Sequence, residues 1–279
     1  MLEAGDQPDA SRRIAEAIAR TLEDGAVAVL ATLIASMPEH TGAKLLVNSS
    51  GERIAGGTSD AAFDSEIAQR AVAFLDSRAE AQTVGVEEFA PQLSAEWRAT
   101  RVLFERIENE PRIVVCGAGH VGASLARLAH AVGYRVTLID DRADFLTRAR
   151  FPETDIELMA ATEGWERAVQ IAVGKGRGVY VAVVTRGHNE DEECMRAVVS
   201  ARPDYVGLIG SKRRTNIVLE RLRESGVEAE ILREVRAPIG LDIGSVSPEE
   251  VALAVLAEIV AVRRGGSGRS LSAWRRQQL

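Results

Sequence analysis

Six residues, Gly117-Ala118-Gly119-His120-Val121-Gly122, have the types and spacing of a turn that binds phosphate. In such a turn Gly117 lets the chain bend sharply, Gly119 lets the backbone approach an anion, and Gly122 lets the next helix pack closely on the sheet. N–H groups at the start of that helix face the ligand, and the helix dipole favours its negative charge. The alternative is a turn that serves only the packing of a helix on a sheet.

Two acidic residues, Asp140 and Asp141, follow the turn by about 20 positions, the distance at which an acid binds ribose hydroxyls in dinucleotide-binding folds. Either carboxylate could accept such hydroxyls. Arg142 comes directly after them and would also permit a 2′-phosphate. The choice between NAD and NADP therefore stays open at this point.

A second motif, Thr185-Arg186-Gly187-His188, leaves the apolar run at 179–184. In an open α/β sheet the loops after the first and fourth strands border the ligand crevice, so we expect this motif to meet the glycine turn there. His120 and His188 could donate hydrogen bonds to a phosphate or a pterin edge, or serve as acid and base. A purely structural role for each histidine is the alternative.

Two further motifs supply polar residues after later strands. Ser211 and Lys212 open a helix after the run at 205–209, where a basic group suits an anion. Asp242 is a single acid within Pro238-Ile-Gly-Leu-Asp-Ile-Gly244, so it either caps backbone groups or faces a site. We assign no catalytic residue and no metal ligand.

Positioning these motifs requires a sheet, and residues 111–264 alternate apolar runs with helical patterns. Strands are expected near 112–116, 135–140, 156–159, 179–184 and 205–209. Runs such as Val179–Val184 show no polar alternation, which is typical of parallel strands covered on both faces. The fold class is therefore α/β, with a C-terminal doubly wound parallel (Rossmann-like) sheet. Its first helix should bury a stripe of Val121, Leu125, Leu128 and Val132, and its last should begin at a Ser247–Glu250 capping box.

Residues 1–90 follow another pattern and predict a smaller N-terminal α+β domain. It should contain a helix near 10–23, a strand near 26–35, a hairpin around 48–51 and a helix near 61–77. Residues 91–110 are expected to be a linker, with a further strand possible at Val102–Phe104, and 265–279 a disordered tail.

Composition restricts the partners. The chain has 279 residues and a net charge of −7, which argues against nucleic acid or an anionic membrane surface as a partner. Its two cysteines, Cys116 and Cys194, lack metal-ligand spacing and fit a reducing compartment. No stretch has the length of a membrane span, and we expect a cytoplasmic protein that binds small ligands.

Six motifs, in order along the second domain, closely resemble those of the xanthine dehydrogenase accessory protein family (XdhC/CoxI type): Gly117-Ala-Gly-His-Val-Gly122, Ile139-Asp-Asp-Arg142, Phe151-Pro152, Thr185-Arg-Gly-His188, Tyr205-Val-Gly-Leu-Ile-Gly-Ser211 and Ala237-Pro-Ile-Gly-Leu-Asp-Ile-Gly244. The resemblance implies a maturation factor without turnover of its own, which binds the molybdenum cofactor (molybdopterin), protects its sulfurated form and delivers it. The implied partners are a xanthine dehydrogenase-like or carbon monoxide dehydrogenase-like molybdenum hydroxylase, a cofactor-sulfurating enzyme and a second copy in a homodimer.

The first domain departs from the family pattern. The family's Gly-Gly-Cys-x-Glu element reads Asp60-Ala-Ala62-Phe-Asp64, so Ala62 stands in place of the cysteine, and Glu39 and His40 replace paired basic residues. The chain then either holds the cofactor by its second domain alone or has diverged. The alternative functions are an NAD(P)-dependent oxidoreductase, with His188 as proton donor, and a protein in which nucleotide binding is only regulatory.

Overall fold

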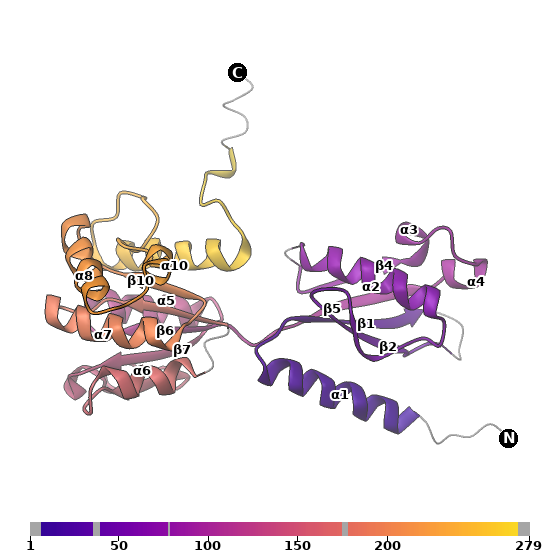
Figure 1. Ribbon diagram of the computed structural model, residues 1–279, viewed down its shortest axis with the longest axis horizontal. Coiled ribbons are helices and arrows are strands. Elements are labelled where there is room, and N and C mark those ends of the chain that lie inside the picture. Colours follow the sequence, from indigo (N-terminus) through magenta and orange to yellow (C-terminus); the bar gives the residue numbers. More distant parts are fainter. Residues whose placement is uncertain (1–6, 36–39, 78, 175–177, 273–279) are drawn as a thin grey trace. The chain divides into compact units, whose positions relative to one another are not determined.

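The computed structural model describes residues 7–35, 40–77, 79–174 and 178–272 (Figure 1). The chain forms two compact units, Met1–Asn109 and Glu110–Leu279. Each unit is built on one five-stranded sheet. Among the helices of the described ranges, none is long and apolar enough to cross a membrane.

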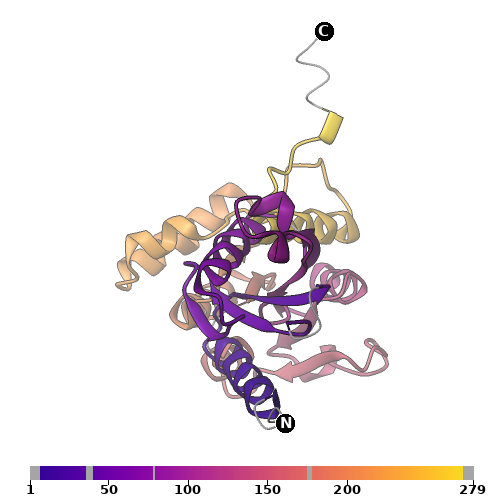
Figure 2. The same ribbon diagram turned by 90° about the vertical axis from the view of Figure 1, so that its right-hand side faces the viewer.

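The N-terminal unit has an antiparallel sheet with strand order β3-β2-β1-β5-β4. Its elements are α1 (Gln7–Glu23), β1 (Ala28–Ala35), β2 (Lys44–Asn48), β3 (Arg53–Gly56), α2 (Ala61–Leu75), β4 (Ala81–Gly85), α3 (Val86–Phe89), α4 (Ala95–Arg98) and β5 (Arg101–Ile107). Helix α2 covers one face, where Phe63 packs with Val29, and α1 covers the other, where Ile14 packs with Leu30 (Figures 1 and 2). Since successive side chains of a strand point to opposite faces, β1 is apolar on both.

The helices near 10–23 and 61–77, the strand near 26–35 and the hairpin around 48–51 are confirmed. The strand expected at Val102–Phe104 is confirmed as β5 (Arg101–Ile107). It lies between β1 and β4 of the first sheet, so the predicted linker at 91–110 is wrong over these residues. Val102 and Phe104 of β5 are fully buried in the core of this unit. The polar stretch before β5 contains a proline, but the chain then returns to the antiparallel sheet of the N-terminal unit. This unit therefore extends to Asn109.

The C-terminal unit has a parallel sheet with strand order β10-β9-β6-β7-β8. Its elements are β6 (Arg112–Cys116), α5 (His120–Ala131), β7 (Arg135–Asp140), the 3₁₀ turn η1 (Ala143–Phe145), β8 (Ile156–Ala160), α6 (Trp165–Val173), β9 (Val179–Val183), α7 (His188–Ala201), β10 (Tyr205–Leu208), α8 (Lys212–Glu224), α9 (Ala229–Glu234) and α10 (Pro248–Arg264). Helices α5 and α10 cover one face, and α6, α7 and α8 cover the other (Figure 1). This arrangement confirms the predicted doubly wound, Rossmann-like fold.

All five parallel strands lie within one residue of their predicted positions. Val179–Val183 is buried at every position, as expected for a strand between two layers of helices. Helix α10 begins at the predicted capping box, in which the Ser247 hydroxyl accepts from the Glu250 N–H and the Glu250 carboxylate accepts from the Ser247 N–H.

The end of helix α5 differs from the prediction, and part of the C-terminal tail lies outside the described residues. The sequence predicts that Val132 belongs to the buried stripe of α5. It is instead 58% exposed, because the helix ends at Ala131. Of the tail that is expected to be disordered, residues 273–279 lie outside the described residues.

Candidate functional site

The glycine turn lies between β6 and α5, and two of its glycines cannot carry a side chain. Gly117 has φ of +116°, and a Cβ there would lie 2.6 Å from the Val184 carbonyl oxygen. A Cβ on Gly122 would lie 1.8 Å from the carbonyl oxygen of Gly117. These contacts explain the close fit of the turn, the helix and β9. Beside Gly119 there is open space, with no atom within 4 Å of a Cβ built there.

This open space lies beside the N-cap residue of α5, and the beginning of a helix is a place where an anion could bind. The first N–H groups of a helix have no acceptor within the helix, so His120, Val121 and Gly122 present donors at the positive end of the helix dipole. Gly119 is the N-cap residue and has an extended conformation, φ −66° and ψ −169°, which any residue can adopt. Neither backbone strain nor a neighbouring atom therefore requires glycine at this position.

Asp140 does not serve as the free ribose acceptor that its position predicts. Its side chain is only 2% exposed and turns back to the glycine turn, where it accepts the Ala118 N–H at 2.6 Å. It also accepts the backbone N–H and the guanidinium of Arg142 at 2.9–3.0 Å. Burial alone would raise the pKa of Asp140, but these hydrogen bonds outweigh burial and hold the pKa below its usual value.

The carbonyl of Ala118 is held from the other side by Arg150. The guanidinium of Arg150 donates to the Ala118 oxygen at 3.0 Å and to the Phe145 oxygen at 2.7 Å. Arg142 and Arg150 both stack on the Phe145 ring, 3.6 and 4.9 Å from its centroid. Sequence reasoning missed Arg150, because no spacing rule connects it to a turn more than 30 residues away.

The loops after β6, β7 and β9 meet at the crevice where strand order reverses. Arg186, from the predicted second motif, donates two hydrogen bonds of 3.0 Å to the two carboxylate oxygens of Asp141 and lies 3.5 Å from Glu190. The remaining cavity is about 30 Å³, the size of a single water molecule. Its lining includes Gly117, Gly119, Asp140, Asp141, Arg142, Val184, Thr185, Arg186 and Glu190.

The charges around this cavity leave it slightly negative. Three carboxylates, those of Asp140, Asp141 and Glu190, face two guanidinium groups, those of Arg142 and Arg186, for a balance of −1. The side chains of Arg186 and Asp141 are 44% and 31% exposed. The ion pair that closes the crevice is therefore accessible to solvent and able to separate. In the Asp140–Arg142 pair, by contrast, the carboxylate is buried and only the guanidinium is partly exposed.

Thr185 is oriented by a buried acid that the sequence reasoning did not single out. Its hydroxyl donates to Asp191, which is fully buried in the first turn of α7. Arg214 of α8 donates to the same carboxylate through Nε at 2.8 Å and through Nη2. From sequence alone Asp191 looks like an ordinary acid at a helix start, so only the fold reveals its two partners.

Among the side chains that the structure describes, those of the other predicted site residues are not in the cavity lining. His120 is exposed at the first position of α5, and Asp242 is exposed in the loop before α10. Ser211 caps α8 by accepting the Arg214 N–H at 3.3 Å, and Lys212 is exposed at the first position of that helix. Gly187 is the N-cap residue of α7, and His188 begins that helix, but the side chain of His188 lies outside the described residues.

Neither cysteine has the environment of a reactive thiol. Cys116 and Cys194 are both fully buried and free, and their side chains contact each other. Burial raises the pKa of Cys194 well above its usual value, with a smaller contribution from Cys116. Over residues 7–35, 40–77, 79–174 and 178–272, no three His, Cys, Asp or Glu side chains are grouped to hold a metal ion.

In the N-terminal unit Ala62 is an exposed residue at the start of α2. Asp60 caps this helix by accepting the Ala62 and Phe63 N–H groups at 2.9 and 3.1 Å, and it accepts the Trp97 indole N–H at 2.8 Å. The Phe63 bond, followed by the Trp97 bond, holds the pKa of Asp60 below its usual value. His40 lies against the Trp97 ring, with centroids 4.7 Å apart, and Glu39 lies outside the described residues.

Two family models match the chain, and together they account for most of both units. The model described as the XdhC Rossmann domain matches residues 113–259, more than half of the chain, and the XdhC and CoxI family model matches residues 21–87. The chain belongs to the XdhC/CoxI family.

Three curated proteins are similar to parts of this XdhC/CoxI family chain. "Uncharacterized protein YqeB" of Escherichia coli K12 is 33% identical over 158 residues, covering 57% of the chain and 28% of YqeB. A probable xanthine dehydrogenase subunit of Bacillus subtilis is 30% identical over 167 residues, covering 60% of the chain and 47% of that protein. "Molybdenum cofactor insertion chaperone PaoD" of Escherichia coli K12 is 34% identical over 84 residues, covering 29% and 26%. The chain thus spans between about a quarter and a half of the length of these relatives.

Proposed function

We propose that this protein binds the molybdenum cofactor in the crevice of its C-terminal unit and delivers it to a xanthine dehydrogenase-type molybdoenzyme during maturation of that enzyme. Membership of the XdhC/CoxI family supports this role. So do the names of two relatives, a molybdenum cofactor insertion chaperone and a probable xanthine dehydrogenase subunit. The observation that carries the proposal is the open space beside Gly119, the N-cap residue of α5.

The residues of the turn fit the anionic end of the cofactor. A phosphate beside Gly119 would accept hydrogen bonds from the first N–H groups of α5, and the helix dipole would favour its charge. Asp140 and Arg150 contribute indirectly, because they hold the two polar groups of Ala118 and so fix the shape of the turn. The cofactor itself supplies the molybdenum chemistry, and this protein supplies binding and orientation.

The cavity of about 30 Å³ does not accommodate a pterin ring while Arg186 is paired with Asp141. Binding of the whole cofactor therefore requires this ion pair to separate. Once released, Arg186 can pair with the ligand's phosphate, for which a guanidinium is a suitable bidentate donor. Release of the cofactor to the acceptor enzyme would re-form the Arg186–Asp141 pair and close the crevice.

The position of Asp140 favours this function over a nicotinamide-dependent oxidoreductase. Dinucleotide-binding sites need a free carboxylate for the ribose hydroxyls at the end of the second strand. Here the Asp140 carboxylate already accepts four hydrogen bonds from its own chain. Arg142, the residue that would permit a 2′-phosphate, donates its guanidinium hydrogen bonds to the same carboxylate. A nucleotide with only a regulatory role would have to use Asp141 instead, and that carboxylate is paired with Arg186.

On the same basis we propose that the partners are a molybdenum hydroxylase and a cofactor-sulfurating enzyme in the cytoplasm, and that the protein is a homodimer. Ala62 stands where the family pattern has a cysteine, so no thiol is available at the start of α2. The C-terminal unit would then hold the cofactor without a thiolate from the N-terminal one.

The proposal is tested by loading the purified protein with molybdenum cofactor released from a molybdoenzyme. Bound pterin is measured by fluorescence after oxidation, and delivery by the activity regained when the loaded protein is mixed with a cofactor-free molybdenum hydroxylase. We expect binding and delivery by the native chain and neither by Gly119→Val. Tight binding of NAD or NADP without binding of the pterin would refute the proposal.

A further inference from the structure

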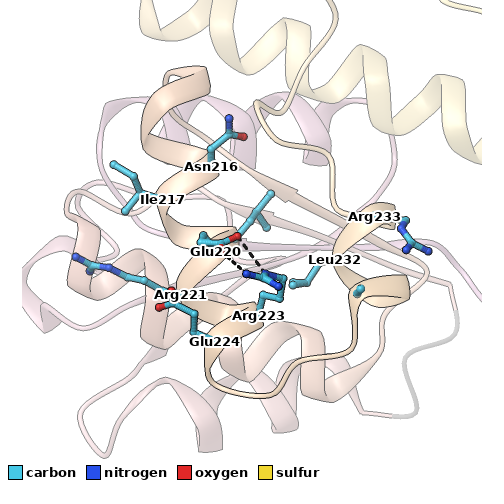
Figure 3. Close-up of a pocket in the computed structure, with 10 residues that line it drawn as sticks. Asn216, Ile217, Glu220, Arg221, Arg223, Glu224, Leu232 and Arg233 are labelled. Atoms are coloured by element: carbon cyan, nitrogen blue, oxygen red, sulfur yellow. Dashed lines mark hydrogen bonds and ion pairs between the residues drawn. The ribbon is translucent and has the colours of Figure 1, made fainter.

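A groove of about 730 Å³ lies between α8 and α9, formed by side chains outside the cofactor crevice (Figure 3). Its lining includes the apolar side chains of Ile217, Leu219 and Leu232. Ile217 is 38% exposed, although its neighbour Val218 is fully buried in the core. The groove thus offers apolar surface that the fold of this unit does not cover.

The helix that forms one bank of the groove is basic, in contrast to the chain as a whole. Helix α8 contains five Lys and Arg residues and two Glu residues, a balance of +3, whereas the chain has a net charge of −7. The groove lining itself contains three arginines and two glutamates, a balance of +1: Arg221, Arg223 and Arg233 with Glu220 and Glu224. Such a basic surface on an acidic protein favours an acidic partner, because complementary charges speed the encounter and exclude wrong partners.

The position of two of these charges is unfavourable for the helix itself. Lys212 and Arg213 are in the first turn of α8, where the helix dipole disfavours cations. Arg214 in the same turn is compensated by Asp191, but Lys212 and Arg213 are exposed and have no acidic partner in the part of the chain that the structure describes. Arg213 lies one helical turn before Ile217 on the same face, so it extends the groove with an available cation.

The arginines on the banks can change partners at little cost. Arg223 pairs with Glu220, and Arg233 pairs with Glu230 at 3.0 Å; each of these side chains is more than half exposed. Exposed pairs of this kind contribute between about 0 and 1 kcal/mol, so a partner's carboxylates can replace the glutamates. The bank itself is held in place, because α8 is bound to α7 through Arg214 and its buried partner Asp191.

We propose that the α8–α9 groove is a docking site for an acidic amphipathic helix of a partner protein. Leucine-like residues of that helix would cover Ile217 and Leu232, and its carboxylates would face Arg213, Arg223 and Arg233. An amphipathic helix in an apolar groove is a common mode of recognition, in which anchors three or four positions apart supply most of the binding energy. A groove this open to solvent would leave much of a small ligand uncovered.

The test uses a short fluorescein-labelled peptide of leucine, alanine and glutamate, with leucine at every third or fourth position, and fluorescence anisotropy. We expect Ile217→Ser to weaken its binding about fivefold, since over a third of the isoleucine surface remains to be buried. We expect Arg233→Glu to weaken binding by a similar factor and more so at low salt. All these positions are exposed, so the fold is retained.

Matched controls exist on helix α6. Ile171 is 59% exposed and Arg167 forms an exposed pair with Glu163, so Ile171→Ser and Arg167→Glu should leave peptide binding unchanged. Equal binding of a peptide with lysine in place of glutamate, unaltered binding by Ile217→Ser, or no binding of the acidic peptide would each overturn the proposal. A change in the protein's own oligomeric state in Ile217→Ser would also overturn it, by assigning the groove to a second copy of this chain.

Discussion

Replacing Asp141 by asparagine separates two possible roles of this residue in the crevice. If Asp141 accepts hydroxyls of a bound nucleotide, as its position in the sequence suggests, the change weakens binding. If its role is to hold Arg186 in the free protein, the change frees that guanidinium for a phosphate and strengthens binding. The geometry favours the second role, because both carboxylate oxygens of Asp141 already accept from Arg186 at 3.0 Å.

The expected gain follows from the exposure and charge of the pair. A bidentate ion pair whose side chains are 44% and 31% exposed is worth about 1 kcal/mol. The ligand must supply this free energy when it displaces Asp141, and the variant removes the requirement. Loss of this carboxylate would also change the charge balance of the cavity lining from −1 to 0. Since about 1.4 kcal/mol is a factor of ten, we expect Asp141→Asn to bind pyrophosphate and the molybdenum cofactor about fivefold more tightly.

The assay is isothermal titration calorimetry of the purified protein with pyrophosphate, molybdenum cofactor, NAD and NADP at one low ionic strength. Glu163→Gln is the matched control, because it removes an exposed carboxylate paired with Arg167 on the same unit and far along the chain from the turn. It should leave all four affinities unchanged. The reasoning is refuted if Asp141→Asn binds these ligands more weakly than the native chain, or if Glu163→Gln gains as much.

Three other predictions concern the glycines of the turn, the carboxylate of Asp140 that supports it, and a hydrogen bond between β10 and α10. Gly119→Val should keep the native unfolding temperature but lose the binding of phosphate-bearing ligands in the same titration. Gly122→Ala should lower the free energy of unfolding by about 3 kcal/mol or more, because its Cβ would overlap the backbone of the turn. Asp140→Asn should cost about 2–3 kcal/mol in urea unfolding at neutral pH. Folding lowers the pKa of Asp140, so its stabilisation is complete above the unfolded value of 3.8. The difference between the two proteins should therefore narrow as pH falls from 3.8 through the folded value. Tyr205→Phe should cost about 1–2 kcal/mol in the same measurement, because it removes the 2.6 Å hydrogen bond to Glu258; an unchanged midpoint would contradict that role.

The sequence by itself determined the C-terminal fold and the glycine turn. Their signals are local: apolar runs such as Val179–Val183 can only be strands covered on both faces, and the Ser247–Glu250 capping box specifies where α10 begins. Gly117 and Gly122 follow the same logic, since backbone crowding at a strand-to-helix turn excludes a side chain at each. The six motifs further suggested the family to which the matched models assign the chain.

Only the tertiary structure decided which partners the charged side chains choose. Asp140 and Asp141 are adjacent in sequence, yet successive positions at a strand end point in different directions, so one turns inward to Ala118 and the other outward to Arg186. Asp191 and Arg150 act on the loops through contacts with residues distant in sequence, which spacing cannot reveal. A strand at Val102–Phe104 is expected from the sequence, but its place in the first sheet is not, because its pairing with β1 joins segments about 70 residues apart.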